Sequence, residues 1–294
     1  MKNWHYALLV FLGGCCYGIL STFVKLAYSV GFSPSEVTGS QYFLGTILIW
    51  SAVLFTKKKK LNLKQILKIM MCGIPFGLTG IFYYHSLKTL NASLAIIFLF
   101  QFVWIGALFD WIFNKKKPGK QKLVSIIILL IGSFLAANIF VQKNYTFSLE
   151  GTIFGILAAL SYTTFIFFSS SVEKDTPPVL KSALLSTSAL VVIFLLFPPS
   201  FLFHFHILRG LIPYGLILGI FGVVFPPILF SIGMPKVEPS LGTILPASEL
   251  PVATIMSSIV LSEYVNPSQW FGVLLILIGI IVGNVVYERK AVEA

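Results

Sequence analysis

The stretch PSLGTILPASELPVATIMSSIVLSE, residues Pro239–Glu263, decides how this chain must fold. It is apolar enough and long enough to cross a bilayer as a helix. Near its middle lies one carboxylate, Glu249, flanked by Pro246 and Pro251. Neither proline has an N–H, so two carbonyls near Glu249 lose their usual helical donors. A charge beside loosened backbone is tolerated within a membrane where it lines a cavity, so Glu249 is the leading candidate for a functional residue.

The composition extends this conclusion to the whole chain. Of its 294 residues, 57% are hydrophobic and only 11% are charged, with a mean hydropathy of +0.92. A soluble domain is about a quarter charged, so the composition indicates an all-α integral membrane protein. Cys15, Cys16 and Cys72 all fall in apolar runs, without the spacing of a disulfide framework or a metal site. We therefore expect no cofactor and no metal.

Apolar runs of spanning length alternate with short polar segments, which predicts ten transmembrane helices. The predicted spans are Trp4–Val30, Ser35–Phe55, Gln65–Leu87, Asn91–Asn114, Lys122–Phe140, Leu149–Ser171, Val179–Phe197, Arg209–Ile232, Pro239–Leu261 and Pro267–Tyr287.

The lysines and arginines predict the orientation, because positively charged loops stay in the cytoplasm. With the N-terminus inside, the inner segments hold 16 of these residues and the outer segments hold three. We therefore expect a multi-pass protein of the inner (plasma) membrane with both termini cytoplasmic. The same distribution explains the net charge of +11 as a topology signal, so no nucleic-acid partner is expected.

An internal repeat divides the chain into two halves, residues 1–144 and 145–294. The tripeptide Leu130-Ile131-Gly132 recurs as Leu277-Ile278-Gly279, and Ala92-Ser93-Leu94 is matched by Pro239-Ser240-Leu241 at the same offset. Each half holds five predicted helices. An odd number makes the halves cross the membrane in opposite directions, so they form an inverted repeat. Secondary transporters commonly have this arrangement, with the substrate site near the midplane between the repeats.

On these features the chain resembles the drug/metabolite transporter superfamily, in its ten-helix EamA branch. The resemblance rests on the two halves and on the short turns Leu90–Ala95 and Val237–Gly242, each leading into a helix that starts with small residues. It also rests on the mid-helix proline of Glu249-Leu250-Pro251 and on the closing Leu261-Ser262-Glu263. The first half departs from this pattern, since Gln101-Phe102-Val103 has no proline and Lys116 replaces the closing glutamate. The resemblance implies export or exchange of small metabolites, often amino acids or their relatives.

Two of the charges inside predicted spans, Glu249 and Lys25, are site candidates, and each has two interpretations. Glu249 either titrates, binding a proton or the cationic end of a substrate, or serves as a structural carboxylic acid bonded to a neighbour. Lys25 lies about 31 Å along the first helix from Trp4, near its outer end. It either extends its ammonium to the interface or receives an anionic group at the outer mouth.

The remaining candidates are aromatic. His85 could shuttle protons or could be a hydrogen-bonded packing residue. Amphipathic rings at spanning depth are candidates to line a substrate pathway, and these are Tyr17, Tyr83, Tyr84, Trp104 and Tyr162.

The sequence thus predicts a secondary carrier that moves a small polar metabolite by alternating access, as exporter or exchanger. Its partners would be that metabolite and the surrounding lipid, with a monomer as the working expectation. It is not expected to be an enzyme, because no GxxxxGK[ST] phosphate loop or HExxH helix occurs. The rival interpretations are a membrane enzyme, which would need acids or histidines clustered at one face, and a non-transporting sensor, which would normally carry a soluble domain.

Overall fold

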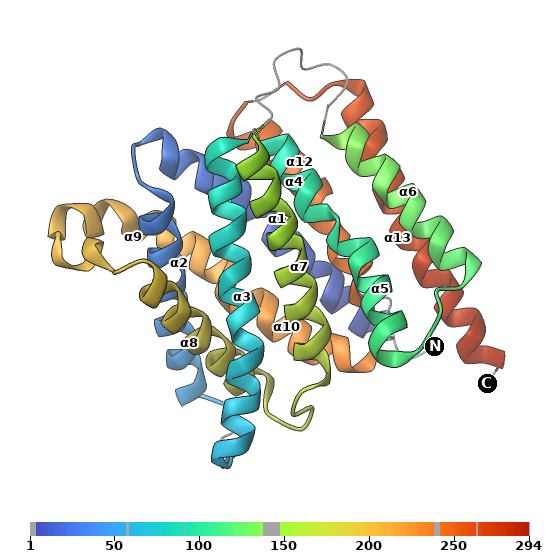
Figure 1. The fold of residues 1–294 in the computed structure, drawn as a ribbon, viewed down its shortest axis with the longest axis horizontal. Coiled ribbons are helices and arrows are strands. Elements are labelled where there is room, and N and C mark those ends of the chain that lie inside the picture. Colours follow the sequence, from blue (N-terminus) through green and yellow to red (C-terminus); the bar gives the residue numbers. More distant parts are fainter. Residues whose placement is uncertain are drawn as a thin grey trace.

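The protein is a bundle of helices. The computed structural model describes residues 4–56, 59–90, 92–137, 148–237, 242–262 and 264–293, and every regular element within them is helical (Figure 1). The first half contains α1 (Trp4–Ser29), α2 (Pro34–Leu54), α3 (Leu63–Thr89), α4 (Ala92–Phe100), α5 (Phe102–Asn114) and α6 (Lys120–Ala136). The second half contains α7 (Leu149–Ser171), α8 (Pro178–Leu196), α9 (Phe205–Gly219), α10 (Phe225–Gly233), α12 (Glu249–Val260) and α13 (Pro267–Glu293).

The described residues of the second half also contain four short turns. Three are 3₁₀ turns, η1 (Ser200–Phe203), η3 (Met234–Lys236) and η4 (Leu245–Ser248), and η2 (Ile220–Val224) is a π-turn that joins α9 to α10.

Within the described residues these elements form ten helical segments, which agrees with the predicted number. Seven described segments are long and apolar enough to span a bilayer, including Leu94–Asn114, which joins α4 to α5, and Phe205–Lys236, which runs from α9 to η3. The other three are shorter: α6 has 17 residues, and the remaining two are Leu245–Val260 and Pro267–Gly283. The eighth segment begins at Phe205, four residues before the predicted start.

Polar residues at the helix starts fix where the second and third spans begin. Ser33 and Glu36 form a reciprocal capping box at α2, in which the Ser33 N–H donates to Glu36 Oε2 at 2.8 Å. Asn62 and Gln65 form the same arrangement at α3, with bonds of 3.0 and 2.8 Å. Each box satisfies N–H groups that the first helical turn leaves unpaired.

Helix packing follows the internal repeat. The fourth span (α4 and α5) packs on α7, and the ninth (η4 and α12) packs on α1. Likewise α3 packs on α7 and α8, while the eighth span (α9, η2 and α10) packs on α1 and α2. Two further pairs, α2 with α8 and α6 with α13, join equivalent helices of the two halves. These main contacts thus have counterparts under exchange of the halves, as an inverted repeat requires.

The repeated Leu-Ile-Gly motif lies in one of those self-equivalent pairs, α6 against α13. A Cβ added to Gly132 would stand 2.9 Å from the Ile276 side chain, and one added to Gly279 would stand 2.8 Å from Leu129. Ser125 Oγ also donates to the Gly279 carbonyl at 2.7 Å. The glycines are therefore needed for close approach, as in other membrane helix pairs.

The outer surface of the bundle is apolar. Large exposed hydrophobic side chains occur on most of the helices, among them Leu12, Trp50, Met71, Ile127, Ile153, Leu195 and Leu274. Soluble monomers rarely expose such extensive apolar surface. These faces are the ones that lipid would cover.

The helices α3 and α6 begin, and α5 and α7 end, at one end of the bundle (Figure 1). Charged residues near these helix ends form ion pairs. Glu173 pairs with Lys68 at 3.8 Å and accepts a bond from Gln65 at 3.0 Å. Asp110 is buried on α5 and pairs with Lys122 at the start of α6, at 3.4 Å. Lys115, directly after α5, ends the helix in the left-handed region with φ 57°.

Candidate functional site

The site is built around an interruption in the ninth span. The sequence predicted one continuous helix over Pro239–Leu261, but the chain forms the 3₁₀ turn η4 before α12 begins at Glu249. Pro246 lies within η4, where the missing N–H breaks the α-helical bonding pattern. Pro251 is the third residue of α12, where an N–H would have no intrahelical partner. The prolines therefore place the start of a helix at Glu249.

Small residues of α1 allow close approach to this interruption. A Cβ added to Gly14 would lie 2.7 Å from the Pro246 backbone, and one added to Gly18 would meet the Glu249 carbonyl oxygen. Ser248 Oγ also donates to the Phe11 carbonyl at 2.7 Å. These contacts hold η4 and the Glu249 backbone against α1, so packing on α1 sets the position of Glu249.

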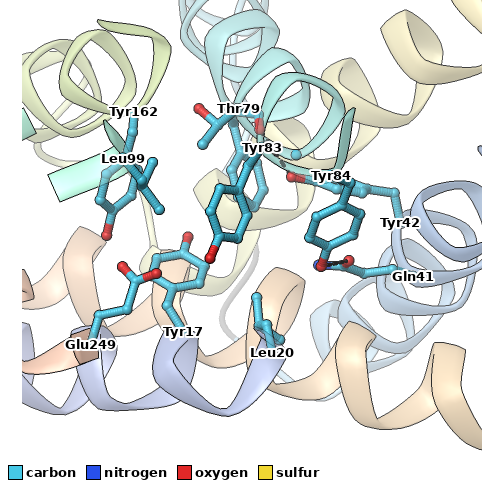
Figure 2. Close-up of a pocket in the computed structure, with 12 residues that line it drawn as sticks. Tyr17, Leu20, Gln41, Tyr42, Thr79, Tyr83, Tyr84, Leu99, Tyr162 and Glu249 are labelled. Carbon is cyan, nitrogen blue, oxygen red and sulfur yellow. Dashed lines mark hydrogen bonds between the residues drawn. The ribbon is translucent and has the colours of Figure 1, made fainter. Parts of the chain in front are cut away.

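Glu249 lines a cavity of about 470 Å³ that lies between the two halves (Figure 2). Its walls come from α1, α2, α3 and α4 of the first half and from α7 and α12 of the second. The lining residues are Tyr17, Leu20, Gln41, Tyr42, Phe76, Thr79, Gly80, Tyr83, Tyr84, Leu99, Tyr162 and Glu249. Five of the sequence-predicted site residues thus share one cavity: Glu249, Tyr17, Tyr83, Tyr84 and Tyr162.

Three tyrosine hydroxyls converge on the space beside the Glu249 carboxylate: those of Tyr17, Tyr83 and Tyr162 (Figure 2). Each hydroxyl is buried and has no hydrogen-bond partner among the described residues. Buried polar groups in folded proteins are nearly always bonded, so three such groups around one cavity need an explanation. A ligand or water in the cavity would supply the missing partners.

The other two tyrosines of the cavity are satisfied. Tyr42 donates to the Phe76 carbonyl at 2.9 Å, and Tyr84 donates to Gln41 Oε1 at 2.7 Å. Figure 2 places the Tyr84–Gln41 bond at the end of the cavity opposite Glu249. At one end of the cavity the polar groups, Tyr84 and Gln41, are bonded to each other. At the other end, beside Glu249, the hydroxyls have no partner among the described residues.

Glu249 is partly exposed to the cavity, and no hydrogen bond or ion pair to its carboxylate occurs within the described part of the chain. No lysine, arginine or histidine is among the described residues that line the cavity. A carboxylate in this setting can hold a proton or bind the cationic group of a ligand.

Lys25 lies outside this cavity. It lines a second cavity of about 570 Å³ with Ser21 and Thr22 of α1, Thr254 and Ser257 of α12, and Gln269 of α13. The Thr22 hydroxyl is buried there without a hydrogen-bond partner in the described structure. Glu249 and Lys25 thus line separate cavities, each bordered by α1 and α12.

The other sequence-predicted candidates are placed elsewhere. The Trp104 side chain is 42% exposed on α5, and its indole N–H donates to Gln101 Oε1 at 2.7 Å. His85 bonds to Glu150 at 3.0 Å and contacts the Phe154 ring, with centroids 4.3 Å apart. Neither residue lines either cavity.

Sequence reasoning missed Gln41, Tyr42, Phe76 and Thr79. Gln41 carried a usable signal, since a lone amide within the apolar run of the second span is uncommon. Phe76 carried none, because 28 phenylalanines occur in this chain and the sequence does not distinguish cavity-facing from lipid-facing rings.

Comparison with known proteins agrees with this architecture. The profile of the EamA-like transporter family matches twice, over residues 4–138 and 149–285. Two relatives from Bacillus subtilis (strain 168) carry the descriptions uncharacterized transporter YwfM and uncharacterized transporter YdfC. YwfM is 24% identical over 65% of this chain, and YdfC is 25% identical over 49%. The aligned part spans 64% of the length of YwfM and 47% of that of YdfC.

A solved structure, titled only as the crystal structure of a protein, has the same fold. It superposes with a TM-score of 0.71 over 94% of this chain and 98% of its own, at 18% identity. The fold, the exchange symmetry of the helices and the double profile match agree with one another. The chain belongs to the EamA-like transporter family.

Proposed function

We propose that the protein is a secondary transporter that moves a small polar metabolite, an amino acid or a related compound, across the plasma membrane. It works by alternating access, as an exporter or an exchanger. The central cavity is the substrate site, and Glu249 is the group in it that binds a proton or the substrate's cation. Lys25, in the second cavity, acts at the outer mouth.

One observation carries this proposal: an unpaired carboxylate and three unbonded hydroxyls share a cavity between the two halves. Intramembrane ionisable groups are expensive and in carriers mark the ion or substrate pathway. Rocking of one inverted repeat against the other would expose such a cavity to each side in turn.

The orientation rests on the charge distribution. The described end that carries Lys68, Lys122 and Lys181 is the basic one, and basic loops stay in the cytoplasm. Lys181 is buried there and donates to the Ser169 and Val172 carbonyls at 2.6 and 2.7 Å, which caps the end of α7. Both termini would then be cytoplasmic.

The test is transport by the purified chain. Proteoliposomes loaded with a soluble metabolite extract should release at least one compound faster than empty liposomes do, as measured by untargeted mass spectrometry. The Glu249→Gln variant should release that compound more slowly. The matched control is Asp175→Asn, which removes an exposed carboxylate from the α7–α8 loop. If no compound leaves faster than from empty liposomes, the transport function is wrong.

A further inference from the structure

The described lining of the central cavity has one acidic side chain. Glu249 supplies a carboxylate, and the described lining contains no basic side chain to balance it. A ligand that brought its own carboxylate would place a second negative group in a water-poor space without a counter-charge, which is strongly unfavourable. Lys25 cannot serve as that counter-charge for a compact ligand here, because it lines the other cavity.

The polar atoms beside Glu249 match a primary ammonium group. Such a group has three N–H donors and no acceptor, like the head of a lysine side chain. The carboxylate and the hydroxyl oxygens of Tyr17, Tyr83 and Tyr162 are acceptors, and all four side chains point toward the same space (Figure 2). One ammonium placed there would neutralise Glu249 and bond to hydroxyls that otherwise have no partner.

Aromatic rings surround that space. Tyr17 and Tyr162 stand edge to face with centroids 5.6 Å apart, and Tyr83 lies 6.0 Å from Tyr84. A group that enters this space is therefore enclosed by aromatic carbon as well as by the three hydroxyls.

The remainder of the cavity offers few free polar groups. Gln41 Oε1 already accepts from Tyr84, and the Thr79 hydroxyl donates to the Pro75 carbonyl at 2.7 Å. Leu20, Leu99 and Phe76 supply apolar surface between the two ends. This apolar part of the cavity suits a ligand whose remaining atoms are compact and apolar.

From these observations we infer that the substrate is a small monoamine, with one cationic amine at Glu249, a compact apolar body and no carboxylate. The inference rests on the proposed transport function and narrows its metabolite class. Amines related to amino acids by loss of the carboxyl group fit this description, whereas the amino acids themselves do not.

Binding of matched probes to the purified full chain tests the inference. Phenethylamine, 2-phenylethanol, 3-phenylpropionate and phenylalanine carry the same ring and differ in charge. Isothermal titration calorimetry should give phenethylamine the lowest Kd, about tenfold or more below that of phenylalanine. Isoamylamine and leucine repeat the comparison with an aliphatic body. Equal or tighter binding of the amino acids, or no binding of either amine, would overturn the inference.

Substitutions in the cavity test whether phenethylamine binds beside Glu249. Glu249→Gln should weaken phenethylamine about tenfold or more, since a charge-assisted bond is lost. Each Tyr→Phe change at Tyr17, Tyr83 or Tyr162 should weaken it about three- to tenfold. Tyr214→Phe, whose ring contacts Phe32 outside the cavity, and Asp175→Asn should leave the Kd unchanged. A Kd that Glu249→Gln does not alter, in a variant with normal thermal stability, places the amine elsewhere and contradicts the inference.

The transport function and the monoamine assignment can be contradicted separately. Release of a carboxylate-bearing metabolite by the proteoliposomes, without amine binding, would keep the transport function and remove the monoamine assignment. Glu249-dependent amine binding without any release would keep the assignment of the cavity and remove transport.

Discussion

Gln101 and Glu249 mark the interruptions of two equivalent spans, one in each half. Gln101 lies between α4 and α5; its amide donates to the Ile97 carbonyl at 2.9 Å and accepts from Trp104 at 2.7 Å. Glu249 begins α12 directly after η4, and its carboxylate has no partner among the described residues. The same place in the fold thus holds a satisfied amide in one half and an unpaired carboxylate in the other.

Because of this asymmetry, Tyr162 and Trp104, both predicted from the sequence to line the pathway, have different surroundings. Tyr162 faces Glu249, whereas Trp104 bonds to Gln101 and is largely exposed. Tyr162→Phe should therefore slow metabolite release from proteoliposomes about three- to tenfold, the effect of one lost hydrogen bond. Trp104→Phe should change the rate by less than about twofold, as expected away from the site. A larger loss from Trp104→Phe than from Tyr162→Phe would place the pathway along α5.

Close packing of α1 on the interruption predicts a stability effect at Gly18. A Cβ there would lie 2.7 Å from the Val252 side chain and would also meet the Glu249 carbonyl. Gly18→Ala should cost about 1–3 kcal/mol and lower the Tm measured in detergent. The control is Gly119→Ala, because a Cβ at Gly119 has open space around it and its φ is negative. An unchanged Tm for Gly18→Ala would show that α1 is not held against the start of α12.

Labelling of single cysteines tests the topology. After replacement of Cys15, Cys16 and Cys72, a cysteine at Lys117 or Lys174 should be protected from an impermeant thiol reagent in intact cells. One at Ser200, in η1, should react. Permeabilised cells provide the control, since all three positions should then label. The reverse pattern in intact cells would contradict the orientation proposed from the lysines and arginines.

Lys25 and Glu249 should act independently, because they line separate cavities. Lys25→Met should change apparent affinity for the released metabolite and leave its pH dependence intact. In a double-mutant cycle with Glu249→Gln, the two effects should add to within about 0.5 kcal/mol. A markedly larger coupling energy would show that the cavities communicate.

Much of the fold was predictable because hydropathy and charge act locally along the chain. Apolar runs gave ten spans, and the Leu-Ile-Gly repeat that indicated two halves proves to be their α6–α13 contact. The first three residues of the predicted ninth helix lie outside the described residues, and over 243–248 the prediction was wrong. The interruption there depends on how η4 packs against α1 as well as on Pro246.

The candidate site was predictable only where residue type alone carried information. Glu249 was visible as a charge at membrane depth, and four tyrosines were visible as amphipathic rings. The contrast between the unbonded hydroxyl of Tyr83 and the bonded one of Tyr84 was not, because it depends on Gln41, which is remote in sequence. The direction in which Trp104 points is likewise set by tertiary packing.

The pH dependence of transport tests the central claim about Glu249 most directly. The groups that face its carboxylate are the hydroxyls of Tyr17, Tyr83 and Tyr162, and no lysine, arginine or histidine is among the described residues of the cavity. If Glu249 binds and releases a proton during transport, metabolite release by wild-type proteoliposomes should vary with pH. Glu249→Gln keeps the shape and removes the titrating group, so its slower release should be independent of pH. Normal release by Glu249→Gln at every pH would show that the carboxylate is structural, and would contradict the account.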